Sequence, residues 1–450
     1  MSTWHHSWRE LRATLALAVP IVIGQVSQMA MNVTDSVMIG RVGTVPLAAS
    51  AFAGTVFGMF FVLGIGMLMP VAVLVARSRG AGDPASGAQL LRHGLALALG
   101  FGALEFLVMG LLSTQLHRFG QPPEVVEIVG PYYLLIAGSL VPVLAFQTFR
   151  QFAESLGRPW MPMAIMLSSV VLNVFLNWVL IYGHLGVPEL GLTGAGWATL
   201  LSRAAGLAAI ILWVRQDAAL RPWWPQHWTG PLLRARLAEM LRLGIPASGQ
   251  LLFEAGAFTA AAIMMGWLGT VPLAAHQIAI SCAGTTFMFT LGLALATSMR
   301  IGEAAGAGKH GRLRAIGFGA LGAGVALMVV FAAIFVVGGE FLARQFVSDG
   351  EVVALAASLL VVAAVFQVFD GAQVIGAGAL RGLTDIKLPT LITFVAYWVV
   401  ALPGGYWFGV RSGHGALAVW GALAAGLAFA GVFLAVRFAV LTRGPARGVR

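Results

Sequence analysis

Long apolar runs constrain this chain more than any other feature. Twelve of them have about 20 residues or more, the length that an α-helix needs to cross the hydrocarbon core of a bilayer. Their apolar residues do not alternate with polar ones, which argues against a β-barrel. The sequence therefore predicts an all-α polytopic membrane protein with twelve transmembrane helices. The predicted spans are residues 13–38, 47–75, 90–113, 128–150, 161–182, 191–214, 240–265, 274–300, 312–337, 353–377, 389–410 and 415–440.

Composition and charge place these spans in a membrane. Charged residues make up 10% of the chain, whereas a soluble domain carries about 25%. The net charge of +10 reflects Lys and Arg in cytoplasmic loops, so we expect the lipid bilayer and no nucleic acid as a partner. With the N-terminus inside, 22 of the 27 basic residues fall in cytoplasmic segments. We therefore predict a multi-pass protein of a bacterial inner membrane, with both termini cytoplasmic and no cleavable signal peptide.

The chain also repeats itself. The hexapeptide TVPLAA occurs at 44–49 and at 270–275, an offset of 226 residues, and the same offset aligns Gly66 with Gly292. Each half holds an even number of spans, so the two halves share one orientation and are related by a pseudo-twofold axis along the membrane normal. We predict an N-terminal six-helix lobe at 1–214, a cytoplasmic linker at 215–239 and a C-terminal six-helix lobe at 240–450. A duplicated helical bundle of this kind is typical of a transporter.

Among the acidic residues within apolar spans, three matter most, namely Asp35, Glu254 and Asp370. A carboxylate at the centre of a membrane helix costs about 2.5–3.5 kcal/mol, and such residues usually mark an ion or substrate route. Helix-end snorkelling and structural hydrogen bonds are the alternative explanations. Glu105 also lies in a span, and we assign it a structural role.

Polar residues accompany the acids in the N-terminal half. Asn173 and Asn177 are four residues apart and share one helix face. Together with Asp35 and Thr199 they offer oxygen ligands to a monovalent cation, while ordinary hydrogen bonding between helices is the alternative. Gln28 precedes Asp35 by seven residues, about two helical turns, and aligns with Glu254 in the repeat.

The matching stretches resemble the MATE (multidrug and toxic compound extrusion) family, in its NorM branch. They are DSVMIGRVG at 35–43, LNWVLIYGHLGVPELGLTGAGWAT at 176–199, FEAG at 253–256, PLAAHQIA at 272–279 and FQVFDGAQVIGAGALRGLTD at 366–385. The resemblance covers nearly the whole chain. It implies a V-shaped fold of two six-helix lobes and antiport of drugs against Na⁺ or H⁺.

Carried over residue by residue, the resemblance makes Asp35, Glu254 and Asp370 the cation-coupling acids, with Na⁺ held at Glu254 and Asp370 if Na⁺ is the ion. Phe366 stands where the family often has an aromatic hydroxyl, which leaves Na⁺ and H⁺ both open. We expect the substrates to be small cationic or amphipathic drugs, bound in an apolar and aromatic cavity. The expected lining residues are Phe253, Phe258, His276, Gln277, Phe287, Met288, Phe289 and Phe366.

Other classes of protein fit less well. A lipid-linked oligosaccharide or polysaccharide flippase of the same superfamily is the main alternative, and it would need a more basic cavity for phosphate. An enzyme would need clustered metal ligands or a nucleophile with its base, and His276 has no partner at such a spacing. A channel would not need two different acid sites in duplicated lobes. We thus expect a secondary antiporter that is a monomer and has no cofactor besides its coupling ion.

Overall fold

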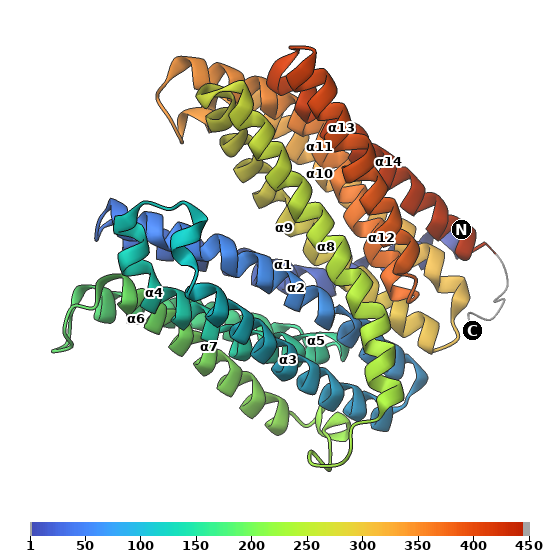
Figure 1. Ribbon diagram of the computed structural model, residues 1–450. Coiled ribbons are helices and arrows are strands. Elements are labelled where there is room, and N and C mark those ends of the chain that lie inside the picture. The colour runs from blue at the N-terminus through green and yellow to red at the C-terminus, as the bar shows by residue number, and fades with distance from the viewer. Residues whose placement is uncertain (1, 444–450) are drawn as a thin grey trace. The chain divides into compact units, whose positions relative to one another are not determined.

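The computed structural model describes residues 2–443, and every regular element in that range is helical. The α-helices are α1 (Ser2–Gly40), α2 (Thr44–Ala81), α3 (Pro84–Ser113), α4 (Pro123–Gly138), α5 (Leu140–Ser155), α6 (Trp160–Tyr182), α7 (Gly191–Gln216), α8 (Arg234–Leu268), α9 (Thr270–Gly306), α10 (Leu313–Arg344), α11 (Gly350–Gly382), α12 (Lys387–Phe394), α13 (Leu402–Gly404) and α14 (Gly415–Leu441) (Figure 1). Short 3₁₀ turns occur at Leu116–Phe119, Arg221–Trp223 and His310–Arg312.

Twelve helical segments among the described residues are long and apolar enough to cross a membrane, which confirms the predicted number of spans. Two of these segments are not single regular helices. The fourth span, Pro123–Ser155, changes from α4 to α5 at Ser139, whose hydroxyl donates to the carbonyl oxygen of Ile136 at 2.6 Å. The eleventh, Lys387–Arg411, contains two π-helical turns at Val395–Ala401 and Gly405–Arg411. They flank Pro403, which cannot donate a backbone hydrogen bond.

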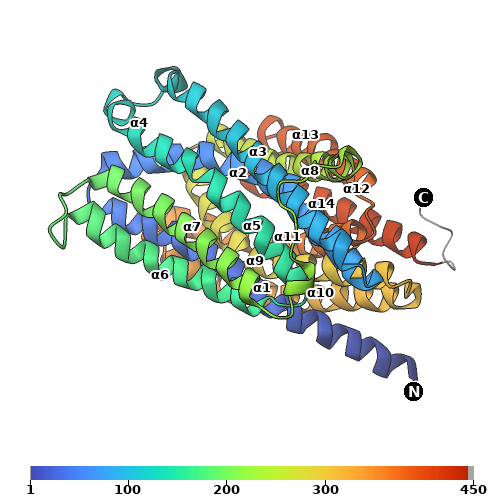
Figure 2. The same ribbon diagram turned by 90° about the horizontal axis from the view of Figure 1, so that it is seen from below.

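The chain divides into two compact units. The first is Ile23–Ser248, which contains α2 to α7, and Figures 1 and 2 show α6 and α7 of this unit side by side. The predicted linker lies inside this unit, between the end of α7 at Gln216 and the first turns of α8. The second unit combines residues up to Val22 with residues from Gly249 onward, and in it α11 packs against α9, α10 and α14.

The helix ends repeat with the sequence. Both α2 and α9 begin at the threonine of a TVPLAA hexapeptide, at Thr44 and Thr270. Gly82 and Gly308, which lie just beyond the ends of these helices, adopt left-handed φ angles of 67° and 68°. Glycine reaches this conformation without the strain that a Cβ would bring. The predicted duplication is therefore present in the backbone.

Two aligned glycines mark a repeated helix crossing. Gly66 on α2 lies against Ser248 on α8, where an added Cβ would be 2.4 Å from the Ser248 Cα. In the other unit Gly292 on α9 lies against Val22 on α1, where an added Cβ would be 2.4 Å from Val22 Cγ2. The 226-residue offset relates Gly66 to Gly292, and it also relates Val22 to Ser248. Close helix contact through small residues is a feature of membrane bundles.

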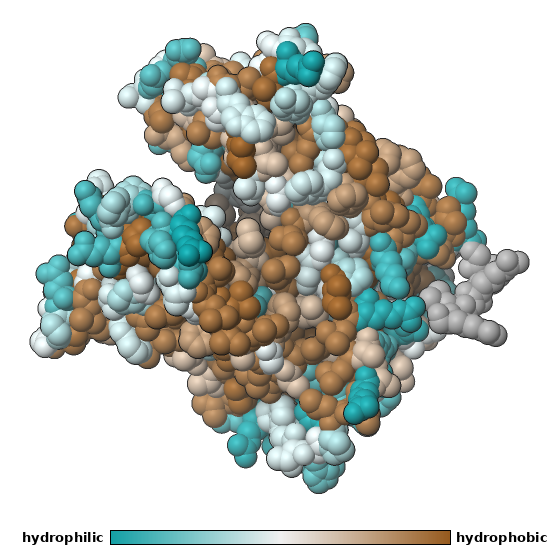
Figure 3. Space-filling model, in the orientation of Figure 1, coloured by the Kyte–Doolittle hydropathy of each residue, from teal (hydrophilic) through white to brown (hydrophobic). Residues whose placement is uncertain are grey.

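The outward faces of the helices are apolar. On α10, for example, Val337 is 89% exposed and Phe341 is 68% exposed. Figure 3 shows hydrophobic residues over the sides of the helices and hydrophilic residues gathered largely near their ends. Exposed apolar surface of this extent is typical of lipid-facing helices.

Candidate functional site

The first polar site surrounds Asp35 in the unit Ile23–Ser248. Asn177 on α6 donates from Nδ2 to Asp35 Oδ1 at 2.6 Å and to Asn173 Oδ1 at 3.3 Å. Both asparagines are fully buried, and Thr199 on α7 lies beside the carboxylate. The structure therefore brings together four of the residues that the sequence singled out. A hydrogen bond to an ionised group contributes about 1.5–3 kcal/mol, so this contact fixes the carboxylate firmly.

Arg203 on α7 lies within electrostatic range of Asp35. Its Nη1 donates to the Ser139 hydroxyl at 2.6 Å, and its guanidinium carbon sits 4.6 Å from the centre of the Phe57 ring. Tyr132 on α4 is close enough to interact electrostatically with both charges. The negative charge of Asp35 is thus opposed by a positive charge in the same unit.

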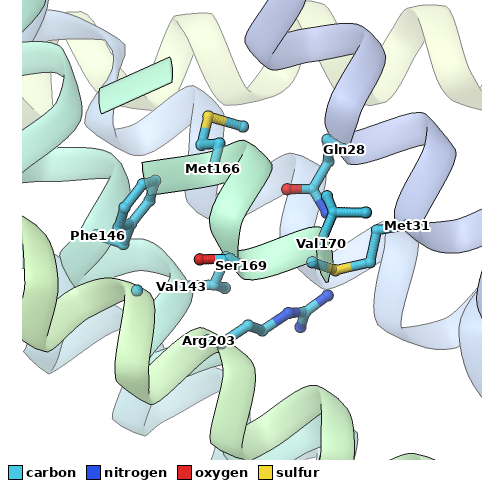
Figure 4. Close-up of a pocket in the computed structure, with 9 residues that line it drawn as sticks. Gln28, Met31, Val143, Phe146, Met166, Ser169, Val170 and Arg203 are labelled. Carbon is cyan, nitrogen blue, oxygen red and sulfur yellow. The ribbon is translucent and has the colours of Figure 1, made fainter. Parts of the chain in front are cut away.

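Gln28 does not join the Asp35 hydrogen bonds. It lines a small pocket beside Arg203, together with residues of α5, α6 and α7 (Figure 4). The polar lining residues are Gln28, Ser169 and Arg203. The pocket holds about 40 Å³, which suffices for a group of a few atoms.

A second buried base in this unit is already neutralised. Arg150, which matches Asp370 when FQTFR at 146–150 is aligned with FQVFD at 366–370, is 3% exposed. Its Nε donates to Glu154 Oε1 at 2.7 Å and its Nη2 donates to Gln25 Oε1 at 3.0 Å. The two halves therefore place opposite charges at equivalent positions. In the N-terminal half the positive charge of Arg150 is neutralised by its ion pair with Glu154.

The second polar site lies in the other unit and contains the two remaining acids. Glu254 on α8 is half-buried and Asp370 on α11 is 5% exposed, and the two carboxyl groups interact electrostatically. Arg381 on α11 and the amide of Gln373 are both near Glu254. Within residues 2–443, Asp370 Oδ1 has no hydrogen-bond partner. Two acids in one apolar unit repel each other unless a proton or cation is shared between them, so this arrangement suits reversible ion occupancy.

A tyrosine hydroxyl also reaches this site. Tyr397, from the π turn Val395–Ala401, is fully buried and donates to Gln373 Oε1 at 3.2 Å. Its ring packs edge-on against Phe258, at 5.8 Å between centroids, and Phe258 packs in the same way against Phe366, at 6.0 Å. Phe366 itself carries no hydroxyl, but Tyr397 of the eleventh span brings one to this site through the same group of packed rings.

The residues expected to line a drug cavity occupy different environments. Phe366 and His276 are packed in the interior, at 2% and 1% exposure, and the indole N–H of Trp420 donates to His276 Nδ1 at 3.1 Å. Gln277 is exposed. The half-buried members are Phe253, Phe258, Phe287, Met288 and Phe289.

Comparison with known proteins agrees with the duplicated helical architecture. A family model described as MatE matches residues 20–179 and again residues 246–407. The two matches start 246 − 20 = 226 residues apart, the offset found in the sequence. The chain belongs to the MatE family. The second match includes both acids of the C-terminal site, and the first includes Asp35 with its two asparagines.

Curated relatives resemble the MatE chain over nearly their full length. A protein of Agrobacterium fabrum named "Probable multidrug resistance protein NorM" is 34% identical, over 97% of this chain and 95% of its own. One of the same name from Rhizobium meliloti is 36% identical over the same shares. A crystal structure of a Vibrio cholerae MATE transporter matches with a TM-score of 0.89 at 21% identity, covering 98% of each chain. An outward-facing multidrug resistance MATE family transporter matches with a TM-score of 0.88 at 22% identity, covering 98% of this chain and 97% of its own. These structures share the fold.

Several residues at the two MatE sites were not assigned to a site from the sequence: Tyr132, Arg203, Gln373, Arg381 and Tyr397. The sequence could have predicted that Gln373 belongs to this site, because it follows Asp370 by three residues and shares its helix face. Arg381 was counted with the cytoplasmic bases, yet it is 7% exposed and interacts with Glu254. A helical side chain extends toward the N-terminus of its helix, which carries the guanidinium back along α11.

The C-terminal site has the chemistry to hold a small cation. No cluster of three or more His, Cys, Asp or Glu side chains placed to bind a metal occurs in the part of the chain that is described. Hard cations instead bind carboxylate, amide and hydroxyl oxygens. This site offers the carboxylates of Glu254 and Asp370, the amide of Gln373 and the hydroxyl of Tyr397. Arg381 adds a permanent positive charge, so one acid is balanced before any ion arrives.

Proposed function

We propose that this protein is a secondary multidrug transporter, which exports small cationic or amphipathic drugs in exchange for Na⁺ or H⁺ moving inward. The names of its MatE relatives support multidrug efflux. The observation that carries the mechanism is the pair of interacting acids, Glu254 and Asp370, in an otherwise apolar unit.

Exchange follows from competition for negative charge. With both acids ionised and Arg381 opposite, the site has a net charge of about −1 and attracts a cation. Occupancy by a proton or Na⁺ neutralises the site and weakens its attraction for a cationic drug. A ligand shifts a conformational equilibrium only through different affinities for the two states, so ion loading must favour one state and drug loading the other. Asp35 and its asparagines provide a further cation site in the N-terminal unit.

The flippase alternative is not favoured by the buried bases. A lipid-linked glycan brings phosphate, which needs unpaired Arg or Lys in the cavity. Arg150 is paired with Glu154, and Arg203 lies within electrostatic range of Asp35. We therefore retain drug efflux, and a transporter of the MatE family needs no enzymatic step.

The membrane setting completes the proposal. The chain is a multi-pass membrane protein, and we place it in the bacterial cytoplasmic membrane with both termini cytoplasmic, on the distribution of basic residues. We propose that it works as a monomer without a cofactor, with Na⁺ or H⁺ as a transported co-substrate.

Neutral substitutions of the two acids test this function. We expect Glu254→Gln and Asp370→Asn each to abolish energised ethidium efflux from intact cells at unchanged expression on immunoblots. Glu351→Gln, an exposed acid in the first turn of α11, is the matched control and should behave as wild type. Wild-type efflux in both acid variants would remove the coupling role of the pair.

A further inference from the structure

The connection between α7 and α8 is hydrogen-bonded to α3, and both belong to one compact unit. Arg92 on α3 donates from Nη1 to the carbonyl oxygen of His227 at 3.0 Å and from Nη2 to that of Pro231 at 2.5 Å. The next residue on α3, His93, accepts at Nε2 from the backbone N–H of Leu233 at 2.8 Å. Leu233 directly precedes α8, so these hydrogen bonds fix the point at which α8 begins.

The partners of His93 determine the tautomer of its ring. A backbone N–H can only donate, so the Nε2 atom that faces Leu233 must carry a lone pair. Nδ1 lies 2.7 Å from the carbonyl oxygen of Gln89, which can only accept, so Nδ1 carries the hydrogen. The ring is fully buried. The hydrogen bond to Leu233 therefore exists only while the imidazole is neutral, because a proton on Nε2 would face another N–H group.

The charged groups around His93 are positive. Arg92 on the same helix and Arg236 on α8 both act on the ring electrostatically. Arg236 in turn donates to Ser86 Oγ at 2.9 Å and to Glu239 Oε2 at 3.1 Å. Uncharged residues of other elements approach α3 on either side of His93, at Gly87 and Gly94, namely Val71, Thr148, Trp223 and Met240. A protonated ring would thus add a positive charge beside two others.

We propose that His93 is a positioning residue that acts as a proton-sensitive latch: its neutral ring holds the start of α8 on α3, and its protonation releases that segment. Further along, α8 carries Glu254, so the latch acts on the helix of an acid that we assign to ion coupling. The proposal goes beyond drug efflux and does not depend on it. In the proposed orientation the latch lies on the cytoplasmic side, where it would respond to acidification of the cytoplasm.

The size of the effect follows from linkage between opening and protonation. An exposed imidazole takes up a proton near pH 6.5, whereas the closed latch accepts only the neutral ring. The stabilisation of the closed latch is therefore fully present above this pH and is lost as the pH falls below it. Opening is expected to be about tenfold more favourable at pH 5.5 than at pH 7.5.

Hydrogen–deuterium exchange of the full chain in nanodiscs tests the latch. Exchange is read by mass spectrometry in peptides that contain Leu233 and is corrected for the intrinsic pH dependence of amide exchange. We expect the protection of this amide in wild-type protein to fall about tenfold from pH 7.5 to pH 5.5. Trp223, whose N–H donates to the carbonyl oxygen of Leu220 at 3.0 Å, is an internal control whose protection should stay constant.

Two variants assign the effect to the ring. His93→Gln keeps an acceptor at this position and does not titrate, so it should protect Leu233 equally at both pH values. His93→Leu has no acceptor and should lower the protection at both. If His93→Leu does not fold, the comparison of wild type with His93→Gln still decides.

Three outcomes would overturn the proposal. They are equal wild-type protection at both pH values, the wild-type fall persisting in His93→Gln, and wild-type protection of Leu233 in a folded His93→Leu protein. Because the experiment measures no transport, these results would leave drug efflux standing. Absence of efflux from wild-type protein would equally leave the latch standing.

Discussion

The repeated glycine crossing gives the sharpest prediction about stability. An alanine at Gly66 would place its Cβ 2.4 Å from Ser248 Cα and 2.7 Å from Ser248 N. Carbon atoms are optimally about 3.5–4.0 Å apart, so the overlap exceeds 1 Å. Because the obstacle is backbone, it cannot rotate away, and the two helices must separate. At Gly292 the nearest atom is Val22 Cγ2, which can rotate, but Val22 Cα and N remain at 3.0 Å.

Overpacking of this kind typically costs 1–3 kcal/mol. We expect Gly66→Ala to lie near the upper end, about 3 kcal/mol, and Gly292→Ala near 2 kcal/mol. The same helices offer matched controls, because an added Cβ at Gly58 on α2 or Gly284 on α9 would meet no atom within 4 Å. Alanine has the higher helix propensity, so these controls should be neutral or slightly stabilising.

The assay is thermal denaturation of the four purified variants in one detergent, followed by size-exclusion chromatography of the folded fraction. We expect lower midpoints for Gly66→Ala and Gly292→Ala than for Gly58→Ala and Gly284→Ala, with the larger drop at Gly66. If all four midpoints agree, the close crossings do not hold the helices, and the structural reason given for the aligned glycines is wrong.

Three further substitutions concern polar contacts. Glu10 accepts from Arg300 Nη2 at 2.5 Å and from Arg312 Nε at 2.6 Å and is about 5% exposed, so Glu10→Gln should lower thermal stability by about 2 kcal/mol, since it removes the closest acid from two partly buried bases. Glu340→Gln, which breaks a pair more than 60% exposed on both sides, should cost under about 1 kcal/mol in the same denaturation assay. Asn177→Leu removes the 2.6 Å hydrogen bond to Asp35. It should raise the KM for a cationic drug about tenfold or more, at unchanged expression. An unaltered KM would show that this hydrogen bond does not contribute to drug binding.

The spans and the duplication were predictable because each depends on local or periodic sequence. Hydropathy over about 20 residues gives a membrane helix directly, and the family model matched both halves at the predicted offset. The change from α4 to α5 at Ser139 was not predicted, since a serine inside a span is compatible with a continuous helix. The π turns around Pro403 were also missed, although a Pro beside two glycines in LPGG is a readable signal.

The composition of the polar sites was only partly predictable. The pairing of Asp35 with Asn177 follows from polar residues on single helix faces, and the Arg150–Glu154 pair has the readable spacing of four residues. The approach of Arg203 to Asp35, or of Tyr397 to Gln373, depends on how helices far apart in sequence are rotated about their axes. No local pattern specifies that rotation; side-chain packing does.

The most direct test of coupling is transport in proteoliposomes with Na⁺ and pH gradients imposed separately on wild-type, Glu254→Gln and Asp370→Asn protein. We predict that wild-type protein moves labelled ethidium against its gradient when one of the two ions flows inward, and that neither variant does so under either gradient. Uphill ethidium movement by both variants at the wild-type rate would contradict the role of the buried acids in coupling ion flow to drug export.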